Sequence, residues 1–409
     1  MESGGGKTAF EEERIGRMMA QDTVSKPQNR IDRDILAQTA CRELMTYGLW
    51  DTKTKAKRWI KKNILRRETT PEDLFFWTTG LLADGLWHYK QTCMVTERAD
   101  AGEKEPALTD PEKSGEVQKE TVFQAEQALS AYYARWMKRG CPIYYPDDLL
   151  SGETLLAAYE EYRANGRSNG LVGAHNVQAC REAVEKLAAY GMNYPVDEMG
   201  SFPYRAAQKN GYIFVDLIGL MCPFLYRYGV VYDRADVMEM AVKQIVNFAA
   251  YGMDGVTGLP YHGYVTDAAC KYGIIGWGRA VGWLLRGMTG CMISEYGAER
   301  LRDAYIALVD AVLPYQHKDG YFSWQLHAMD GPVDTSATGM ICTAMKQGIE
   351  LHILEDSKYA QALQAGKNAV YRSVRDGKVY DCSGECEGFG QYPQRYGAYP
   401  WALGPALRL

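Results

Sequence analysis

The sequence predicts an all-α protein made of stacked helical hairpins. Apolar residues recur at helical spacing from Ile31 onward and mark about twelve helices. The alternation of apolar and polar residues that is typical of strands is almost absent. No shift in composition marks a boundary between residues 31 and 409, so we expect a single domain over this range.

The start of the chain has a different character. Residues 1–30 are polar and mixed in charge, and we expect them to form a mobile or peripheral lead-in. The first helix is predicted at Ile31–Tyr47, where apolar side chains from Ile35 to Met45 share one face. The range Lys53–Arg66 forms a short basic amphipathic segment.

The next helix is predicted to open at Pro71, because a proline followed by acids in the first turn is a helix-start signal. Its apolar residues continue to Trp87. The charged range Glu97–Glu120 contains Pro and Gly, and we expect it to be a connector. The remaining predicted helices each have an apolar face and lie at Val122–Lys138, Pro146–Tyr162, Val177–Tyr190, around Asp216, and at Ala235–Tyr251, Ala280–Tyr296, Arg300–Tyr315, Ala337–Leu354 and Tyr359–Val374.

The composition is that of a soluble globular protein and limits the expected partners. Hydrophobic residues make up 46% of the chain and charged residues 24%. A net charge of -5 gives no reason to expect a nucleic acid or an anionic membrane as a partner. The 29 Tyr and 9 Trp side chains are numerous enough to line a groove for a rigid ligand such as a sugar.

The ten cysteines are scattered through apolar helical segments, and only Cys382 and Cys386 lie close together. Unpaired buried thiols suit a reducing compartment. The N-terminus lacks a basic-then-apolar signal, and no apolar run approaches the length of a membrane span. We therefore expect a cytoplasmic protein. The six histidines are dispersed and no His-Glu-x-x-His helix is present, so we expect no metal ion and no cofactor.

One acid interrupts an apolar run. Asp216 is the only carboxylate between Tyr212 and Tyr226. A buried carboxylate is costly unless it is hydrogen-bonded, paired or protonated, so this residue requires partners. It is either a structural aspartate that caps a helix or accepts hydrogen bonds, or a catalytic acid.

Several loops rich in glycine and aromatic residues precede apolar helices, and loops at one rim of a rigid scaffold are where sites are usually built. Trp277 and Arg279 could present a stacking face and a fixed cation for a carboxylate. Alternatively, they are a helix-entry tryptophan packed on an arginine stem. His262, between Tyr261 and Gly263, is either a donor to a sugar hydroxyl or a surface residue.

Two helix starts carry side chains for which capping is the plain explanation. Asp147 and Asp148 follow a proline, where carboxylates satisfy free N–H groups and the helix dipole. Capping is therefore favoured for at least one of them. Thr335 and Ser336 follow Asp334 at another helix start, where the same explanation applies.

Five segments stand in order along the chain: Tyr145–Gly152, Phe202–Arg205 with Tyr212–Leu225, His262-Gly263, Trp277–Trp283 and Asp334–Met340. Together they resemble the unsaturated glucuronyl and rhamnogalacturonyl hydrolases of glycoside hydrolase families 88 and 105, and the resemblance covers roughly residues 35–409. The resemblance implies an (α/α) toroid barrel of six helical hairpins. It also implies an oligosaccharide substrate left by a polysaccharide lyase, whose terminal uronic acid has a C4=C5 double bond.

The resemblance assigns roles to the candidate residues. Asp216 would be the general acid and base that protonates the vinyl ether at C4 and helps water add at C5. Apolar surroundings suit such an acid, because they keep a carboxyl protonated near neutrality. A second carboxylate is carried to Asp147, with Asp148 as the competing choice. The remaining candidates would bind or order the substrate, by stacking, by holding the uronate carboxylate or by contacting hydroxyls; they are Trp277, Arg279, His262, Trp77, Arg205, Thr335 and Ser336.

One departure from the family pattern concerns the leaving sugar. Rhamnogalacturonyl-type members often have a histidine where this chain has Arg205. The expected activity is of the rhamnogalacturonyl type, and the alternative is a glucuronyl hydrolase acting on glycosaminoglycan-type disaccharides. A non-catalytic carbohydrate-binding (α/α) barrel, an ordinary two-carboxylate glycosidase and a sugar epimerase also stay open. The expected assembly is a monomer or a homodimer.

Overall fold

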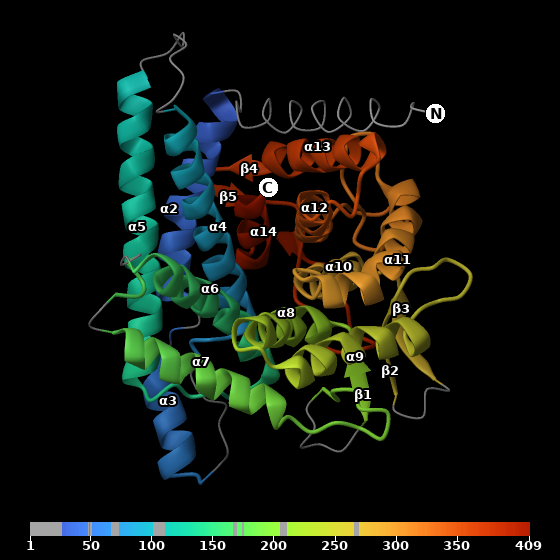
Figure 1. Ribbon diagram of the computed structural model, residues 1–409, viewed down its shortest axis with the longest axis horizontal. Helices are drawn as coiled ribbons and strands as arrows, with labels where there is room; N and C mark the ends of the chain where they lie inside the picture. The colour runs from blue at the N-terminus through green and yellow to red at the C-terminus, as the bar shows by residue number, and fades with distance from the viewer. Residues whose placement is uncertain are drawn as a thin grey trace, which may run out of the picture.

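Helices alternate along the chain between an inner and an outer layer (Figure 1). The computed structural model describes residues 27–47, 49, 51–66, 73–100, 111–166, 170–173, 176–204, 211–265 and 270–409. Within these residues the inner helices are α4 (Trp77–Asp100), α6 (Leu149–Asn165), α8 (Asp216–Val231), α10 (Gly278–Gly290), α12 (Thr335–Glu350) and α14 (Pro400–Arg408). The outer helices are α2 (Pro27–Thr46), α5 (Pro111–Lys138), α7 (Val177–Met192), α9 (Ala235–Tyr251), α11 (Glu295–Val312) and α13 (Ser357–Arg372).

The inner helices form a closed ring. Each packs against the next in chain order, and α14 returns to α4. The burial pattern follows the layers: every residue of α10 is buried, its two arginines included, whereas α9 buries only one face. The predicted (α/α) barrel of six hairpins is therefore confirmed.

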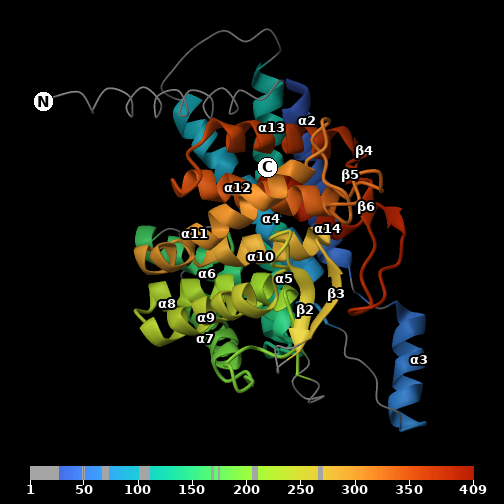
Figure 2. The same ribbon diagram turned by 90° about the vertical axis from the view of Figure 1, so that its right-hand side faces the viewer.

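Short strands cover one end of the barrel (Figure 2). Strands β1 (Tyr212–Phe214), β2 (Tyr261–Val265) and β3 (Lys271–Ile275) form an antiparallel sheet. In this sheet Gly263 faces Phe214, and a Cβ at Gly263 would lie 2.2 Å from the carbonyl oxygen of Ile213, so only glycine fits there. Two smaller pairs join β4 (Val374–Arg375) to β5 (Lys378–Val379) and β6 (Cys382–Ser383) to β7 (Tyr396–Gly397).

Some predicted boundaries were wrong. The connector predicted at Glu97–Glu120 is too long, because α4 extends to Asp100 and α5 begins at Pro111. Glu, Gln and Lys are good helix formers, so a polar composition did not end either helix. The helix predicted at Ala280–Tyr296 is too long and the next one, predicted at Arg300–Tyr315, starts too late, since α10 ends at Gly290 and α11 begins at Glu295. Helix α14 was not predicted.

The N-terminal lead-in is only partly covered. Residues 1–26 lie outside the described residues, and residues 27–30 already belong to α2. None of the ten cysteines forms a disulfide. No helix in the described part of the chain is long and apolar enough to cross a lipid bilayer.

Candidate active site

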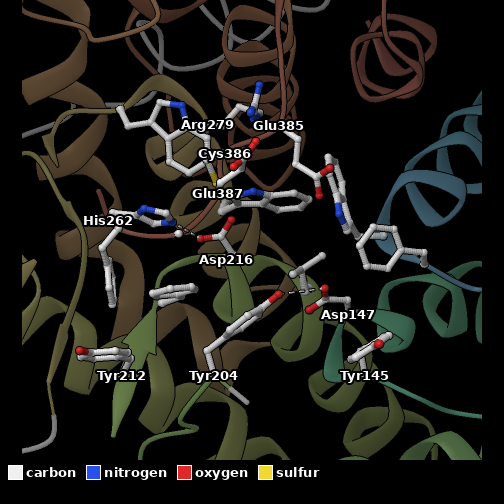
Figure 3. A pocket seen from close by; sticks show the side chains of 18 residues that line it. Tyr145, Asp147, Tyr204, Tyr212, Asp216, His262, Arg279, Glu385, Cys386 and Glu387 are labelled. Atoms are coloured by element: carbon white, nitrogen blue, oxygen red, sulfur yellow. Dashed lines mark hydrogen bonds and ion pairs between the residues drawn. The ribbon is translucent and has the colours of Figure 1, made fainter. Parts of the chain in front are cut away.

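A cavity of about 490 Å³ opens where the inner helices begin (Figure 3). Helix α8 begins at Asp216, α4 at Trp77 and α10 just after Trp277, and all three of these residues line the cavity. The positive ends of these helix dipoles therefore point toward the cavity, where they favour negative charge. The short 3-10 helix η1 (Pro146–Asp148) adds Asp147 to the same wall.

Asp216 lies in the first turn of α8 rather than within the apolar core, and its side chain is 18% exposed. The Nε2 atom of His262 lies 3.0 Å from the Asp216 Oδ2, and the Nδ1 atom lies 2.8 Å from the hydroxyl of Tyr392. The ring of His262 also stacks on Phe214, with centroids 4.8 Å apart. Both nitrogens of the buried His262 thus have protein partners, and one of these contacts orients Asp216. His262 also lines the cavity, and its contact with a substrate hydroxyl stays a prediction.

The two neighbouring aspartates Asp147 and Asp148 have different environments. Asp148 is fully buried outside the cavity wall, and its Oδ2 accepts hydrogen bonds from the backbone N–H groups of Tyr144 at 2.8 Å and Tyr145 at 3.3 Å. It has the capping role that the sequence favoured for one of the pair. Asp147 lines the cavity, where the hydroxyl of Tyr204 donates to its Oδ2 at 3.4 Å.

The cavity environment changes the protonation of Asp147. Burial, followed by the charge of Asp216, raises the pKa of Asp147 to about 7. Its buried Oδ1 has no hydrogen-bond partner among the described residues. Asp147 therefore holds its proton over much of the range below neutrality and can make a further hydrogen bond.

Arg279 lines the cavity but is held by the protein. Its Nη1 donates to the carbonyl of Ser383 at 2.9 Å and its Nη2 to the carbonyl of Gly384 at 2.6 Å. Its guanidinium lies 3.7 Å from Asp334 and 4.9 Å from the ring centre of Trp277. Of the two roles considered for Arg279, these contacts favour ordering the site.

Thr335 and Ser336 are not among the residues that line the cavity, so their role in substrate binding stays a prediction. Both are fully buried. The Thr335 hydroxyl donates to the carbonyl of Tyr380 at 2.8 Å. The Ser336 hydroxyl donates to Asp334 at 2.6 Å, and the backbone N–H of Ser336 donates to the same carboxylate, which caps α12. Ser336 thus holds the Asp334 carboxylate that in turn faces Arg279.

Aromatic side chains form the walls. Trp77 packs edge-on against Trp283, with ring centres 6.0 Å apart, and Trp277 lies 4.8 Å from the ring of His262. The buried indole nitrogen of Trp277 has no hydrogen-bond partner in the described part of the chain. The predicted residues Trp77 and Trp277 thus lie in the same cavity as Asp147 and Asp216, and this cavity suits a flat, polar ligand.

The sequence reasoning missed the segment that follows β6. Glu385, Glu387 and Phe389 line the cavity, and Phe389 packs edge-on against Phe214 with centroids 4.0 Å apart. Desolvation raises the pKa of Glu385, although Arg279 and a hydrogen bond from Trp77 oppose that rise. The signal was present, because this stretch is rich in glycine and aromatic residues and precedes a helix, like the loops that were identified.

Arg205 lies outside the described residues, so its predicted role stays a prediction. Across the described ranges, no group of three or more His, Cys, Asp or Glu side chains is arranged to hold a metal ion. The cavity contains the carboxylates of Asp147, Asp216, Glu385 and Glu387 between aromatic walls, and carboxyl groups are able to transfer protons.

Comparisons with known proteins show similarity to a glycoside hydrolase family. The family model of Glycosyl Hydrolase Family 88 matches residues 118–407. Over 162 residues the chain is 27% identical to a 24.9 kDa protein in the picA locus of Rhizobium radiobacter, covering 36% of this chain and 69% of that protein.

Solved structures share the fold. A possible member of the GH105 family from Klebsiella pneumoniae subsp. pneumoniae MGH 78578 aligns with a TM-score of 0.70 at 15% identity, over 94% of this chain and 92% of that chain. An unsaturated glucuronyl hydrolase from Bacillus sp. GL1, responsible for the degradation of glycosaminoglycan, aligns with a TM-score of 0.60 at 14% identity, over 93% of this chain and 94% of that chain.

Proposed function

Because the chain belongs to glycosyl hydrolase family 88 and is a glycoside hydrolase, we propose that it releases the terminal 4,5-unsaturated uronic acid from oligosaccharides made by polysaccharide lyases. The observation that carries this proposal is the meeting of Asp216 and Asp147 in one aromatic-walled cavity. The unsaturated ring is flat around its double bond, so it fits against an indole face. Its carboxylate suits a cavity at which several helix N-termini converge.

The proposed reaction is a hydration. In its acid form Asp216, oriented by His262, gives a proton to C4 of the vinyl ether. Water then adds at C5 and gives its proton to the Asp216 carboxylate, which restores the acid. The resulting hemiketal opens, and the bond to the next sugar breaks. Asp147, which keeps a proton near neutral pH, would donate a hydrogen bond to the substrate through its oxygen that lacks a described partner. The anomeric carbon is not attacked, so the spacing rule for ordinary glycosidase carboxylates does not apply.

The first test follows the ultraviolet absorbance of the conjugated double bond with lyase-generated disaccharides. The unmodified enzyme should remove this absorbance, whereas Asp216→Asn should lose at least about a thousandfold in kcat/KM, equivalent to about 4 kcal/mol of transition-state stabilisation. Circular dichroism should show that the variant stays folded. Full activity in Asp216→Asn would exclude this residue as the acid, and an inactive unmodified enzyme would favour a non-catalytic carbohydrate-binding barrel.

The charge of the cavity supports a neutral leaving sugar. Glu385 and Glu387 add two carboxylates to Asp147 and Asp216, while the guanidinium of Arg279 is already paired within the protein. A sulfated or uronic leaving sugar would bring a second negative charge, in addition to the uronate carboxylate that the helix N-termini favour, and these groups would repel it. We therefore favour the rhamnogalacturonyl type over the glucuronyl type that acts on glycosaminoglycan disaccharides.

A substrate panel tests this preference. The unmodified enzyme should turn over a disaccharide with a neutral leaving sugar at least about tenfold better than one with a sulfated leaving sugar, a difference of about 1.4 kcal/mol. Glu385→Gln combined with Glu387→Gln should lower the ratio of activity on the neutral substrate to activity on the sulfated substrate. Glu299→Gln, on the exposed face of α11, should leave this ratio unchanged. An equal or reversed preference in the unmodified enzyme would favour the glucuronyl type.

We also propose that the protein is located in the cytoplasm. Seven of the ten cysteines are buried and none is paired, which suits a reducing compartment such as the cytoplasm.

A further inference from the structure

Helix α3 (Thr52–Asn63) stands apart from the barrel. It projects beyond the barrel on the side that carries the β-strands (Figure 2). None of its residues is buried, and Trp59 is 61% exposed and Ile60 43% exposed. The exposed apolar surface continues after the helix at Ile64 and Leu65. Large apolar side chains held in water at one place mark an interaction surface.

The charge of this region is opposite to that of the rest of the chain. Between Asp51 and Glu68 the sequence contains eight Lys and Arg residues and no acid. Because the whole chain has a net charge of -5 and this segment one of +8, the remaining residues carry -13. The net charge of the chain therefore hides a local cationic element, and the partner of this element must be anionic.

The apolar and cationic side chains occupy separate faces of α3. Ala56, Trp59 and Ile60 follow the i, i+3, i+4 spacing and share one face. At 100° per residue, Lys53 and Lys62 border this face on its two sides. This arrangement is typical of helices that lie in the interface of a membrane, with the apolar face inward and lysines level with the headgroups.

The helix is formed before it meets a partner. Its N-cap residue Asp51 accepts a hydrogen bond from the backbone N–H of Thr54 at 2.6 Å. Lys61 and Lys62 lie in the last turn, where cations are favourable for the helix dipole. Binding therefore does not require the segment to fold, which removes one entropic cost.

We propose that α3 docks the enzyme on an anionic lipid surface. Trp59 and Ile60 would enter the boundary between headgroups and acyl chains, while the flanking lysines pair with lipid phosphates. A hydrophilic polyanion such as an acidic polysaccharide or a nucleic acid would neutralise the lysines but leave the apolar face in water. Projection of α3 from the acidic body also keeps most of the negative charge away from the bilayer.

Flotation of the full chain with lipid vesicles tests this proposal. The protein should float with vesicles of phosphatidylcholine and phosphatidylglycerol at low salt, much less at high salt, and not with phosphatidylcholine alone. Trp59→Ser/Ile60→Ser and Lys53→Glu/Lys62→Glu should each lower the partition coefficient at least about tenfold. A matched exchange on the exposed face of α5, Lys119→Glu/Lys138→Glu, should leave flotation unchanged, and so should Val256→Ser, which removes an apolar side chain that is 93% exposed.

Circular dichroism should be the same for all these variants, because α3 has no buried residue and does not line the cavity. Absence of flotation with anionic vesicles, or equal flotation of the α3 variants, would overturn the proposal. So would a dimer in sedimentation velocity that Trp59→Ser/Ile60→Ser dissociates without any flotation, since α3 would then be an interface between copies. Binding to a polyuronate column without flotation would also overturn it.

Discussion

At the scale of single residues, the two aspartates of the cavity are held in different ways. Asp216 is partly exposed and paired with His262, whereas Asp147 is buried, with one oxygen that has no partner among the described residues. A buried carboxyl group such as Asp147, with one oxygen that lacks a partner, lowers the stability of the folded chain when it ionises. Its retention is more easily explained by a ligand than by folding.

The pKa of Asp147 predicts how stability depends on pH. A pKa of about 7, against 3.8 for an ordinary aspartate, means that the folded state binds the proton more tightly than the unfolded state. Stability should therefore fall as the pH rises from about 4 to about 7, by roughly 4 kcal/mol at most. Asp147→Asn removes this loss, so the variant should be more stable than the unmodified enzyme at pH 8 and not at pH 4.

Urea unfolding at the two pH values measures this difference. Asp303→Asn, an exposed change on α11, should alter stability by less than about 0.5 kcal/mol at either pH. An Asp147→Asn variant that is less stable than the unmodified enzyme at pH 8 would show that the aspartate is not a destabilising group.

At the scale of elements, the sequence predicted those helices that are determined by their own local pattern of apolar residues. It did not predict a helix that forms only because of its packing in the folded protein. Helices with continuous apolar faces were located, and α9 was placed at its observed bounds. Helix α14 was missed because it is short and contains two prolines, so only its burial in the ring makes it helical.

The site shows the same division. Asp216 and Trp277 could be identified because each stands out in its own segment, whereas the choice between Asp147 and Asp148 required the structure. Both follow the same proline, and a difference of one position decides which carboxylate caps the helix and which faces the cavity. No local pattern contains that information.

The contact between α4 and α14 gives a prediction about packing. A Cβ at Gly85 would lie 2.6 Å from the carbonyl oxygen of Gly404, so the two helix backbones touch. Gly85→Ala should therefore lower the free energy of unfolding by about 1–3 kcal/mol, because the helices must separate. Gly255→Ala is the matched control, since nothing lies within 4 Å of its added methyl group. Thermal unfolding compares the two, and an equal effect would show that α14 can shift without cost.

At the scale of the whole molecule, charged side chains inside the barrel connect the ring. Arg286 of α10 contacts Glu153 of α6, Asp84 of α4 and the carbonyl of Gly219 in α8. Lys346 of α12 donates to the carbonyl of Arg408 in α14 at 2.7 Å. Together with the ion pair between Arg408 of α14 and Asp84 of α4, these polar contacts join all six inner helices within the described residues. These contacts lie farther along the inner helices than the residues at their starts, which line the cavity.

The ion pair between Arg408 and Asp84 closes the ring and gives a prediction about the free energy of unfolding. The Nη1 of Arg408 lies 2.7 Å from Asp84, which links the last inner helix to the first. Burial raises the pKa of Asp84, but Arg408, His88 and Arg286 lower it more, to about 2. The stabilisation is therefore complete above about pH 4 and is lost as the pH falls toward 2. Asp84→Asn should lower stability at pH 7 by about 3–5 kcal/mol, because it leaves two buried guanidinium groups without this partner.

Urea unfolding at pH 7 and pH 3 separates this pairing from a general packing defect. The difference between Asp84→Asn and the unmodified enzyme should shrink at pH 3, because Asp84 is then largely protonated in the unfolded chain while it is still mostly ionised in the folded state. Combining Asp84→Asn with Arg408→Met should restore part of the stability at pH 7, since the unpaired cation is removed. The result that would contradict this prediction is a double variant whose loss of unfolding free energy equals the sum of the two single losses and is the same at pH 7 and pH 3. The ring would then be closed by apolar packing of α14 on α4 alone.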